Sequence, residues 1–242
     1  MAQITGSAAY MAQKYFEYQK KYRTEPRESD KLLLELIREK VGDLRGKSLL
    51  DIGCHNGNLL YQMKAELPGL RLRGGDLFAD VIAQCQADPD LAGIDFEVMD
   101  ILDLKGSPVD IVVVNAVLFR FDDRQHAQAW KSLAGITKSG GWVFVFDFYH
   151  GFDQTLRIVE ETPEHPEGLI LTFRPQTAVT ETLKSLGFTA ITFQPFCIGI
   201  DLPLSNPRSA LYTHTRPLAG GDRLLFRGTL CQPWCHLAAR KA

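Results

Sequence analysis

The residues with the clearest capacity for chemistry lie in segment 49–58, Leu-Leu-Asp-Ile-Gly-Cys-His-Asn-Gly-Asn. An apolar stretch leads to an acid, Asp51, and then to two glycines, Gly53 and Gly57, in a tight turn that opens a helix. Glycine permits positive φ values and lets main-chain N–H groups approach a ligand closely. The segment therefore predicts a ligand site at the end of a strand.

Two common nucleotide-binding loops do not fit this segment. A dinucleotide-binding turn needs Gly-x-Gly-x-x-Gly, whereas His55 and Asn58 stand where the second and third glycines would be. A Walker A loop needs Gly-Lys-Ser/Thr, whereas Gly57 is followed by Asn58 and Leu59. Histidine at position 55 is compatible with a glycine-like turn, because histidine is enriched among non-glycine residues with positive φ.

Together with the residues at the ends of the later strands, this segment resembles the first motif of class I S-adenosylmethionine (SAM) methyltransferases. That family has an acid, an apolar residue and then Gly-x-Gly-x-Gly. The chain matches at Asp51, Gly53 and Gly57 and has His55 in place of the middle glycine. The resemblance covers roughly residues 45–150 and indicates the superfamily, not a specific member. It implies SAM as cofactor and S-adenosyl-L-homocysteine (SAH) as product.

The resemblance implies a role for the end of each later strand. Asp76 would accept hydrogen bonds from both ribose hydroxyls, and Asp100 would accept one from the adenine amine, with Ile101 against the ring. Residues after the fourth strand would lie beside the methionine portion and the reacting methyl group. The predicted cofactor-binding residues are Asp51, Gly53, His55, Gly57, Asn58, Asp76, Leu77, Asp100, Ile101, Asn115 and Val117.

Methyl transfer requires the acceptor atom to lie in line with the S–CH3 bond, so a dedicated catalytic residue is optional. His150 follows a predicted strand and precedes Gly151, where an imidazole would act as a general base; the alternative is a turn residue without chemistry. Arg23 and Arg27 are further candidates for the cofactor carboxylate or the acceptor. The predicted substrate-binding residues are Tyr15, Tyr22, Phe119, Tyr149 and Arg174, each with a structural alternative in the core or on the surface.

The elements that would position these residues alternate along the chain. Short apolar runs predict strands at 48–52, 70–74, 96–99, 109–114 and 142–148. The intervening segments predict helices at 58–66, 78–86 and 123–137, and an earlier helix begins at Ser29 or Asp30 as its cap. Repeated β-α units of this length predict a parallel sheet covered on both faces.

The pattern changes after residue 149. Residues 149–175 are expected to be irregular, with two short strand-like pieces, followed by a helix at 176–186 and a strand at 189–196. A hairpin signal lies within 200–228, and the last strand is predicted at 234–239. The fold class is therefore α/β, a doubly wound, seven-stranded, mostly parallel sheet with a reversed last strand, an N-terminal helical lid and a hairpin insertion.

We interpret residues 1–242 as a single methyltransferase-like domain. Residues 1–30 form the predicted helical lid, and 45–150 form the cofactor-binding core. Residues 151–175 and 200–228 are additions on the substrate side.

Composition limits the class of protein. The chain has 27 Lys and Arg against 29 Asp and Glu, a net charge of −2, which lacks the basic excess of a general nucleic-acid binder. It has no apolar run near the ~20 residues of a membrane span and no signal-peptide pattern. Five scattered cysteines favour a cytoplasmic setting. Cys231 and Cys235 have no second pair nearby, so no metal site is predicted.

The sequence thus predicts an enzyme, a SAM-dependent methyltransferase that modifies an oxygen or nitrogen atom of a small molecule. One alternative is a methyltransferase that acts on RNA or protein, and another is a non-catalytic SAM- or SAH-binding protein. Aminopropyl transfer from decarboxylated SAM would need an acid-rich pocket, which residues 115–121 do not offer. The acceptor, the oligomeric state and the pathway are not indicated.

Overall fold

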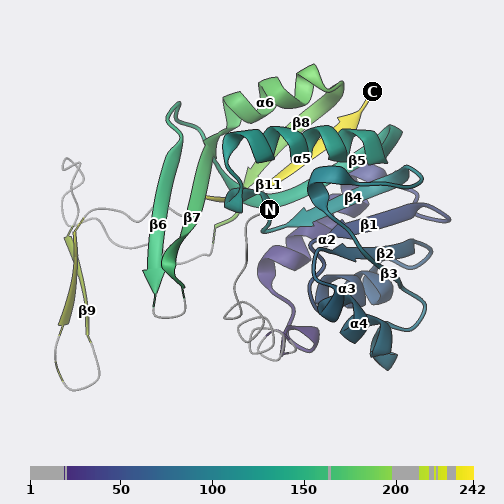
Figure 1. The fold of residues 1–242 in the computed structure, drawn as a ribbon, viewed down its shortest axis with the longest axis horizontal. Helices are drawn as coiled ribbons and strands as arrows, with labels where there is room; N and C mark the ends of the chain where they lie inside the picture. The colour runs from purple at the N-terminus through teal and green to yellow at the C-terminus, as the bar shows by residue number, and fades with distance from the viewer. Residues whose placement is uncertain are drawn as a thin grey trace.

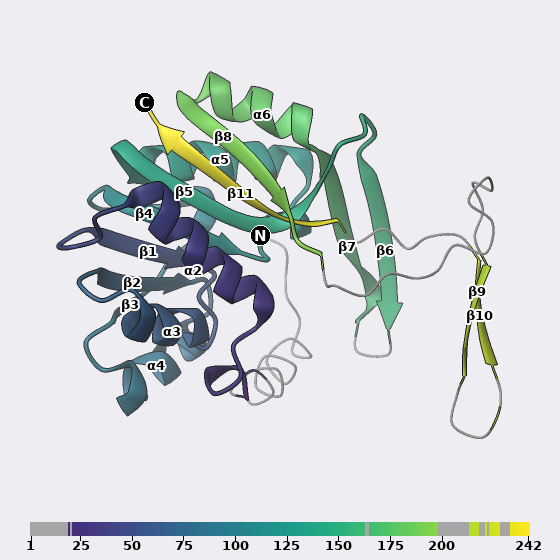
Figure 2. The same ribbon diagram turned by 180° about the vertical axis from the view of Figure 1, so that it is seen from behind.

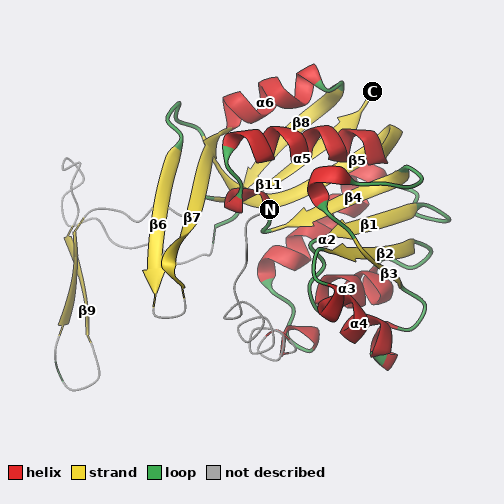
Figure 3. Cartoon of the chain, viewed as in Figure 1, coloured by secondary structure: helices red, strands yellow, loops and turns green. Residues whose placement is uncertain are grey.

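The computed structural model describes residues 19, 21–162, 165–197, 213–217, 221, 223–227 and 233–242. Figure 1 shows a central sheet with helices on both faces, and Figure 2 shows the same arrangement from behind. Figure 3 separates the helices from the strands by colour. The predicted α/β class, with alternating strands and helices, is confirmed.

The central part of the sheet has the strand order β3-β2-β1-β4-β5-β11-β8. The strands from β3 to β5 in this order pair in parallel, whereas β11 pairs antiparallel with both β5 and β8. The predicted mostly parallel sheet with a reversed last strand is therefore confirmed, and its seven strands form this central part. These strands are β1 (Ser48–Ile52), β2 (Arg71–Asp76), β3 (Asp95–Val98), β4 (Val109–Asn115), β5 (Thr137–His150), β8 (Phe188–Pro195) and β11 (Trp234–Lys241).

The helices divide between the two faces of the sheet. Buried side chains of α2, α3 and α4 form one apolar cluster with the sheet, and those of α5 and α6 form another. The α-helices are α2 (Glu28–Val41), α3 (Asn58–Glu66), α4 (Ala79–Ala87), α5 (Asp123–Ile136) and α6 (Gln176–Ser185). The short 3-10 helices are η1 (Lys21–Arg23), η2 (Pro89–Leu91), η3 (Ile101–Asp103) and η4 (Leu118–Arg120).

Strand β4 lies at the centre of the sheet because both of its faces are apolar. Val112 and Val114 join the cluster with α5 and α6, whereas Ile111 and Val113 join the cluster with α2, α3 and α4. All four side chains are fully buried. A parallel strand covered on both faces is typically a continuous β-branched run, as here. This packing holds the carboxyl ends of β1, β2 and β4 at one edge.

The two strand-like pieces expected within residues 149–175 are present as strands, but the expectation that the segment is otherwise irregular is wrong. Strands β6 (Leu156–Thr162) and β7 (His165–Pro175) pair antiparallel, and the end of β7 pairs in parallel with Tyr149 and His150 of β5. Aromatic packing stabilises this arrangement of strands. The ring centroids of Phe148 and Phe173 lie 4.4 Å apart. The two strands extend the central sheet to nine strands.

The predicted hairpin within 200–228 is confirmed for its described part. Strands β9 (Thr213–Pro217) and β10 (Arg223–Arg227) pair antiparallel as a separate two-stranded sheet. The rest of 200–228 that was assigned to the substrate side lies outside the described residues. So does most of the predicted lid at 1–30, of which η1 and the start of α2 are described. No described helix is long and apolar enough to cross a membrane.

Candidate functional site

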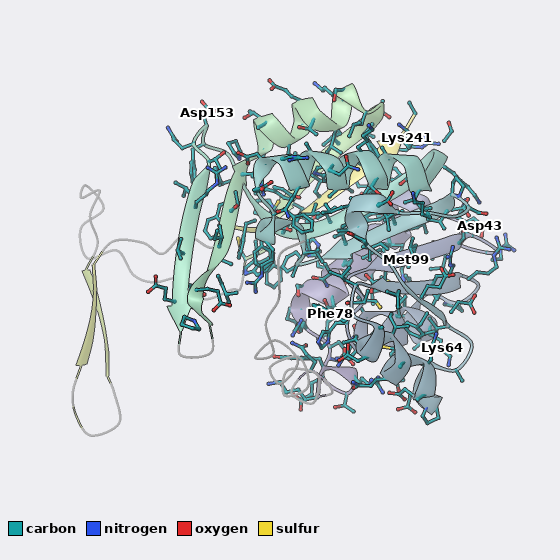
Figure 4. All side chains as sticks on the ribbon, in the orientation of Figure 1. Asp43, Lys64, Phe78, Met99, Asp153 and Lys241 are labelled. Carbon is teal, nitrogen blue, oxygen red and sulfur yellow. The ribbon has the colours of Figure 1, made fainter. Side chains whose placement is uncertain are left out.

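A cavity of about 790 Å³ lies at the carboxyl ends of the parallel strands. Its walls come from the turn after β1, the segments after β2, β3 and β4, the start of α2 and the residues before it. Phe78 and Met99, labelled in Figure 4, are two of the lining residues, whereas Asp43 and Lys241 lie at the opposite edge. Edges of this kind are where open α/β sheets bind ligands.

The turn after β1 adopts the strained geometry that its sequence predicts. Gly53 has φ 77°, and His55, which replaces the expected middle glycine, has φ 46°. A Cβ atom on Gly53 would lie 2.5 Å from Cγ2 of Val117, so only glycine lets these two segments meet. Both segments line the cavity. The departure at His55 therefore preserves the backbone shape of the turn.

Asp76 ties two walls of the cavity together. Its Oδ2 accepts the backbone N–H of His55 at 3.0 Å, and its Oδ1 accepts that of Phe78 at 3.1 Å. The side chain is 8% exposed and lines the cavity. Leu77, beside it, is 53% exposed and also lines the cavity. An exposed leucine beside a held carboxylate offers a ligand both apolar contact and hydrogen-bond acceptors.

The ends of β3 and β4 complete the strand side of the cavity. Asp100 accepts the backbone N–H of Leu102 at 2.8 Å and so begins η3, in which Ile101 is buried. Asn115 and Val117 line the cavity on either side of Ala116, which has φ 59°. All the cofactor-binding residues that were predicted after β2, β3 and β4 thus lie together.

The other wall comes from the chain before and within α2. Gln19, Tyr22, Arg27 and Asp30 all line the cavity. The Arg27 guanidinium donates to the Gln19 side chain and lies 4.1 Å from the Tyr22 ring centre. Asp30 is buried, and its Oδ1 accepts the side-chain N–H of Asn115 at 3.2 Å. Helix α2 is therefore fastened to the end of β4 at this site.

Buried acids dominate the electrostatics of the cavity. Asp51 is 2% exposed, and its Oδ1 has no hydrogen-bond partner. Burial, together with the nearby charges of Asp30 and Asp76, raises the pKa of Asp51 to about 8. Burial also raises the pKa of Asp30, although Arg27 and Asn115 act in the opposite direction. The ionised form of a buried carboxyl group is stabilised by a hydrogen-bond donor or by a cation.

Several predicted site residues do not line the cavity. Gly57, with φ 70°, precedes α3 and uses its N–H within the turn, donating to the Cys54 carbonyl. Asn58 lines the cavity and accepts from Arg23, which also pairs with Asp88 at 2.8 Å. The residues that lie elsewhere are Gly57, Phe119, Tyr149, His150 and Arg174, and Tyr15 lies outside the described residues.

These residues have structural partners instead. The His150 ring stacks on Phe152 with centroids 3.5 Å apart, and its Nδ1 lies 3.0 Å from the Phe152 carbonyl oxygen. Arg174 is buried and donates to the Phe121 carbonyl at 2.7 Å. Tyr149 is fully buried beside α6, and Phe119 packs with Phe148. These four side chains are buried near β7 and η4, which explains why they do not line the cavity.

Sequence reasoning missed Asp30 as a lining residue and interpreted it as a helix cap. That interpretation is wrong, because Arg27 is the cap and Asp30 lies within the first turn. A signal was present, since Asp30 shares the face of the helix with Leu33 and Ile37 at spacings of three and seven. A carboxylate on an apolar helical stripe indicates a special environment. Phe78, Met99 and Gln125 were also missed.

Comparisons with known proteins agree with this geometry. Residues 50–143 match the methyltransferase domain family. No curated protein matches the sequence. A SAM-dependent methyltransferase structure from Methanosarcina mazei is similar, with TM-score 0.56 and 16% identity over 85% of this chain and 96% of that one.

Two further solved structures are similar and were determined with cofactor or product. Human N-acetylserotonin methyltransferase in complex with SAM has TM-score 0.65 and 15% identity, over 100% of this chain and 60% of that one. Burkholderia thailandensis 1,6-didemethyltoxoflavin-N1-methyltransferase, with bound 1,6-didemethyltoxoflavin and SAH, has TM-score 0.57 and 13% identity, over 100% and 93%. This chain thus spans only part of the human enzyme.

The fold and the strand-end cavity define a Rossmann-like α/β protein of the methyltransferase type. The family match shows a methyltransferase domain at residues 50–143, and the fold is similar to that of SAM-dependent methyltransferases. Both the resemblance and the cofactor inferred from the sequence agree with these findings.

Proposed function

We propose that this methyltransferase transfers the methyl group of SAM to an oxygen or nitrogen atom of a small molecule, and that the strand-end cavity binds the cofactor. The observation that carries the proposal is the cavity itself, which gathers residues from the ends of β1, β2, β3 and β4 and from α2. Its volume of about 790 Å³ falls within the range of roughly 300–1,000 Å³ that is usual for small-molecule sites.

The lining residues fit SAM. Each oxygen of Asp76 already accepts one backbone N–H, and each retains a lone pair for a ribose hydroxyl. Leu77 and Phe78 are 53% and 40% exposed, and a purine ring against them would remove apolar surface from water. Asp100 would accept from the adenine amine beside Ile101. The unpartnered Oδ1 of Asp51 leaves an acceptor for the amino-acid portion.

The mechanism we propose is positioning and exclusion of water. SAM supplies an electrophilic methyl group, so the chain has to hold the acceptor in line and keep the site dry. Val117, Arg120 and Phe121 line the cavity after β4, next to the region assigned to the reacting methyl group. His150 is absent from the lining, so the proposed mechanism does not depend on general-base help from this imidazole, and the His150→Ala variant tests that help.

The charge of the cavity supports a small acceptor over RNA. Four carboxyl groups line it, those of Asp30, Asp51, Asp76 and Asp100, against the guanidinium groups of Arg27 and Arg120. Polyanions bind where basic groups exceed acids, which is the opposite balance. The cytoplasmic setting stays a prediction from the sequence.

The test is turnover with methyl-labelled SAM against a panel of phenols, carboxylic acids and amines, with RNA and unfolded protein as parallel acceptors. Label transfer to members of the small-molecule panel supports the proposal. Transfer only to RNA or protein overturns it. Binding of SAM without label transfer to any acceptor favours the non-catalytic alternative. The matched control is the Asp76→Ala variant, which should lose transfer through weaker SAM binding.

A further inference from the structure

We propose that Asp30, in the first turn of α2, forms with Asp51 a carboxyl pair that binds a positively charged centre of the cofactor and releases a proton as the cofactor enters. Asp30 lies outside every motif that the resemblance identifies. The inference rests on the proposed assignment of the strand-end cavity to SAM.

Geometry places the two acids in the lining of the same cavity, Asp30 from α2 and Asp51 from β1. Asp30 is 5% exposed and Asp51 is 2% exposed, and both line the cavity. Asn115 donates to Oδ1 of Asp30 at 3.2 Å, which holds the carboxyl at the end of β4. Oδ1 of Asp51 has no hydrogen-bond partner although it is fully buried. A buried acceptor of this kind points to a donor or cation supplied by a ligand.

The cations of the described chain do not neutralise the pair. The charge of Arg27 acts on Asp30, but its guanidinium donates to Gln19 and lies over the Tyr22 ring. Among the salt bridges of the described residues, none includes Asp30 or Asp51. Within the described part of the chain, Asp30 therefore has the Asn115 amide as a hydrogen-bond donor, and neither acid is in a salt bridge.

The other titratable groups around the pair add no positive charge. Asp76, on β2, is a third acid near Asp51. Burial lowers the pKa of His55, in the turn after β1, and raises that of the Cys54 thiol, so both are neutral near pH 7. On β11, His236 faces the Ser29 backbone, and burial lowers its pKa to about 4. These groups are neutral or negative, and the positive charges in the lining of the cavity are those of Arg27 and Arg120.

A cation on the ligand opposes the effect of burial on the ionisation of Asp30 and Asp51. Burial and the charge of Asp30 favour the protonated form of Asp51, and a cation in the cavity favours the ionised form. SAM carries two candidate cations, the ammonium and the sulfonium, whereas SAH retains only the ammonium. Binding therefore displaces the proton to solvent, and the negative pair gains a counter-ion in place of it.

The first experiment is titration calorimetry of the full chain with SAM at pH 7, in phosphate and in Tris, whose ionisation enthalpies differ. We expect the observed heat to depend on the buffer, with release of up to about one proton per SAM, and affinity to rise from pH 6 to pH 8. Heat that is independent of the buffer would overturn the inference. This measurement on the wild-type chain needs no variant.

The second experiment uses Asp30→Asn, which keeps the shape and the contact with Asn115 but removes the charge. We expect SAM affinity to fall about tenfold and proton release to diminish, because Asp51 is then less protonated before binding. Glu35→Gln, an exposed site on the same helix, is the matched control and should leave both unchanged. Thermal unfolding should not be impaired in Asp30→Asn, since two repelling acids become one. Unchanged affinity and proton release would overturn the inference.

Titration with SAH shows which of the two cations of SAM binds beside the two acids. Equal proton release with SAM and SAH identifies the ammonium as the bound centre, and release with SAM alone identifies the sulfonium. If the wild-type chain does not bind SAM in this cavity, the assignment of the cavity to SAM is wrong, and so is the role proposed for Asp30 and Asp51. Binding of SAM without proton release overturns only the pair.

Discussion

The carboxylate of Asp76 holds the N–H of His55 at 3.0 Å and so joins the end of β2 to the turn after β1. The same side chain accepts the N–H of Phe78 at 3.1 Å, which sets the start of the following segment. One acid therefore shapes two walls of the cavity while retaining lone pairs for a ligand. Its structural and ligand-binding roles can be separated by experiment.

Replacement of Asp76 by alanine should weaken SAM binding by about 1–3 kcal/mol, because hydrogen bonds to a buried ligand are lost. Titration calorimetry measures this directly. Asp80→Ala, at an exposed position on α4, is the matched control and should leave affinity unchanged. Affinity unchanged in Asp76→Ala would discard the ribose assignment. Thermal unfolding of the same variant reports the loss of the two backbone contacts.

Replacement of Gly53 by alanine should destabilise the fold by more than the about 1–2 kcal/mol that positive φ costs an L-residue. The new Cβ would also lie 2.5 Å from Val117. Gly46→Ala is the matched control, since Gly46 has φ 69° and nothing within 4 Å of a Cβ. Urea unfolding should give a larger loss at Gly53, and adding Val117→Ala should recover part of it. Equal losses at the two glycines would contradict the close approach.

Replacement of Asp51 by asparagine should change how stability depends on pH. The folded chain holds the pKa of Asp51 at about 8, above its unfolded value of 3.8. The folded state therefore binds more protons between about pH 4 and pH 8, and the free energy of unfolding falls as pH rises through this range. Without SAM, Asp51→Asn should exceed the wild type in stability at pH 8, and the difference should shrink toward pH 4.

Urea unfolding at a series of pH values measures this difference, with Asp95→Asn at an exposed strand end as the control. A constant difference across the range would show that ionisation of Asp51 is not responsible. SAM binding by Asp51→Asn should be weaker, since the same group supplies an acceptor to the cavity. A gain in stability at the cost of binding is common at functional sites.

Replacement of His150 by alanine should leave SAM affinity and turnover close to wild type. The imidazole stacks on Phe152 and is absent from the cavity lining, so it is not positioned to take a proton from an acceptor. Steady-state kinetics with an acceptor found in the panel is the measurement. A loss of about 100-fold or more in kcat, with SAM affinity retained, would instead support general-base catalysis.

Replacement of Arg174 by alanine should destabilise the fold by about 1–3 kcal/mol, because it removes the guanidinium donor from the Phe121 carbonyl. The guanidinium bonds to the carbonyls of Leu118 and Phe121, on either side of the cavity segment after β4. Arg157→Ala is the control. Arg157 pairs with Asp123 at 2.5 Å but is half exposed, so its loss should cost less than about 1 kcal/mol. Similar losses for both arginines in urea unfolding would contradict the burial argument.

Much of the fold follows from local patterns. The run at Val109–Val114 predicted a central strand because β-branched residues covered on both faces leave few alternatives. The hairpin of β6 and β7 was not predicted, because its order depends on contacts such as Phe148 with Phe173, which join distant segments. Local pattern contains no information on such pairs. The same limit applies to β7 beside the end of β5.

Much of the cavity was also predictable, for a topological reason. Asp51, Asp76, Asp100 and Asn115 each follow or end a strand of one parallel sheet, and such ends meet at one edge. His150 and Arg174 also lie near strand ends, but β7 pairs with β5 there and buries both side chains. His150 and Arg174 do not line the cavity, because β7 covers the edge of the sheet at their positions.

Local sequence pattern was enough to predict the class of fold, the glycine turn at Gly53 and the acids at the strand ends, because these depend on backbone conformation and on the alternation of strands and helices. Long-range packing, by contrast, brings Asp30 to Asn115, stacks His150 on Phe152 and sets Arg174 against the Phe121 carbonyl. The physical reason is burial. Whether a charged or polar side chain meets a ligand or a partner depends on which surfaces pack over it, and packing joins residues that are distant in the chain.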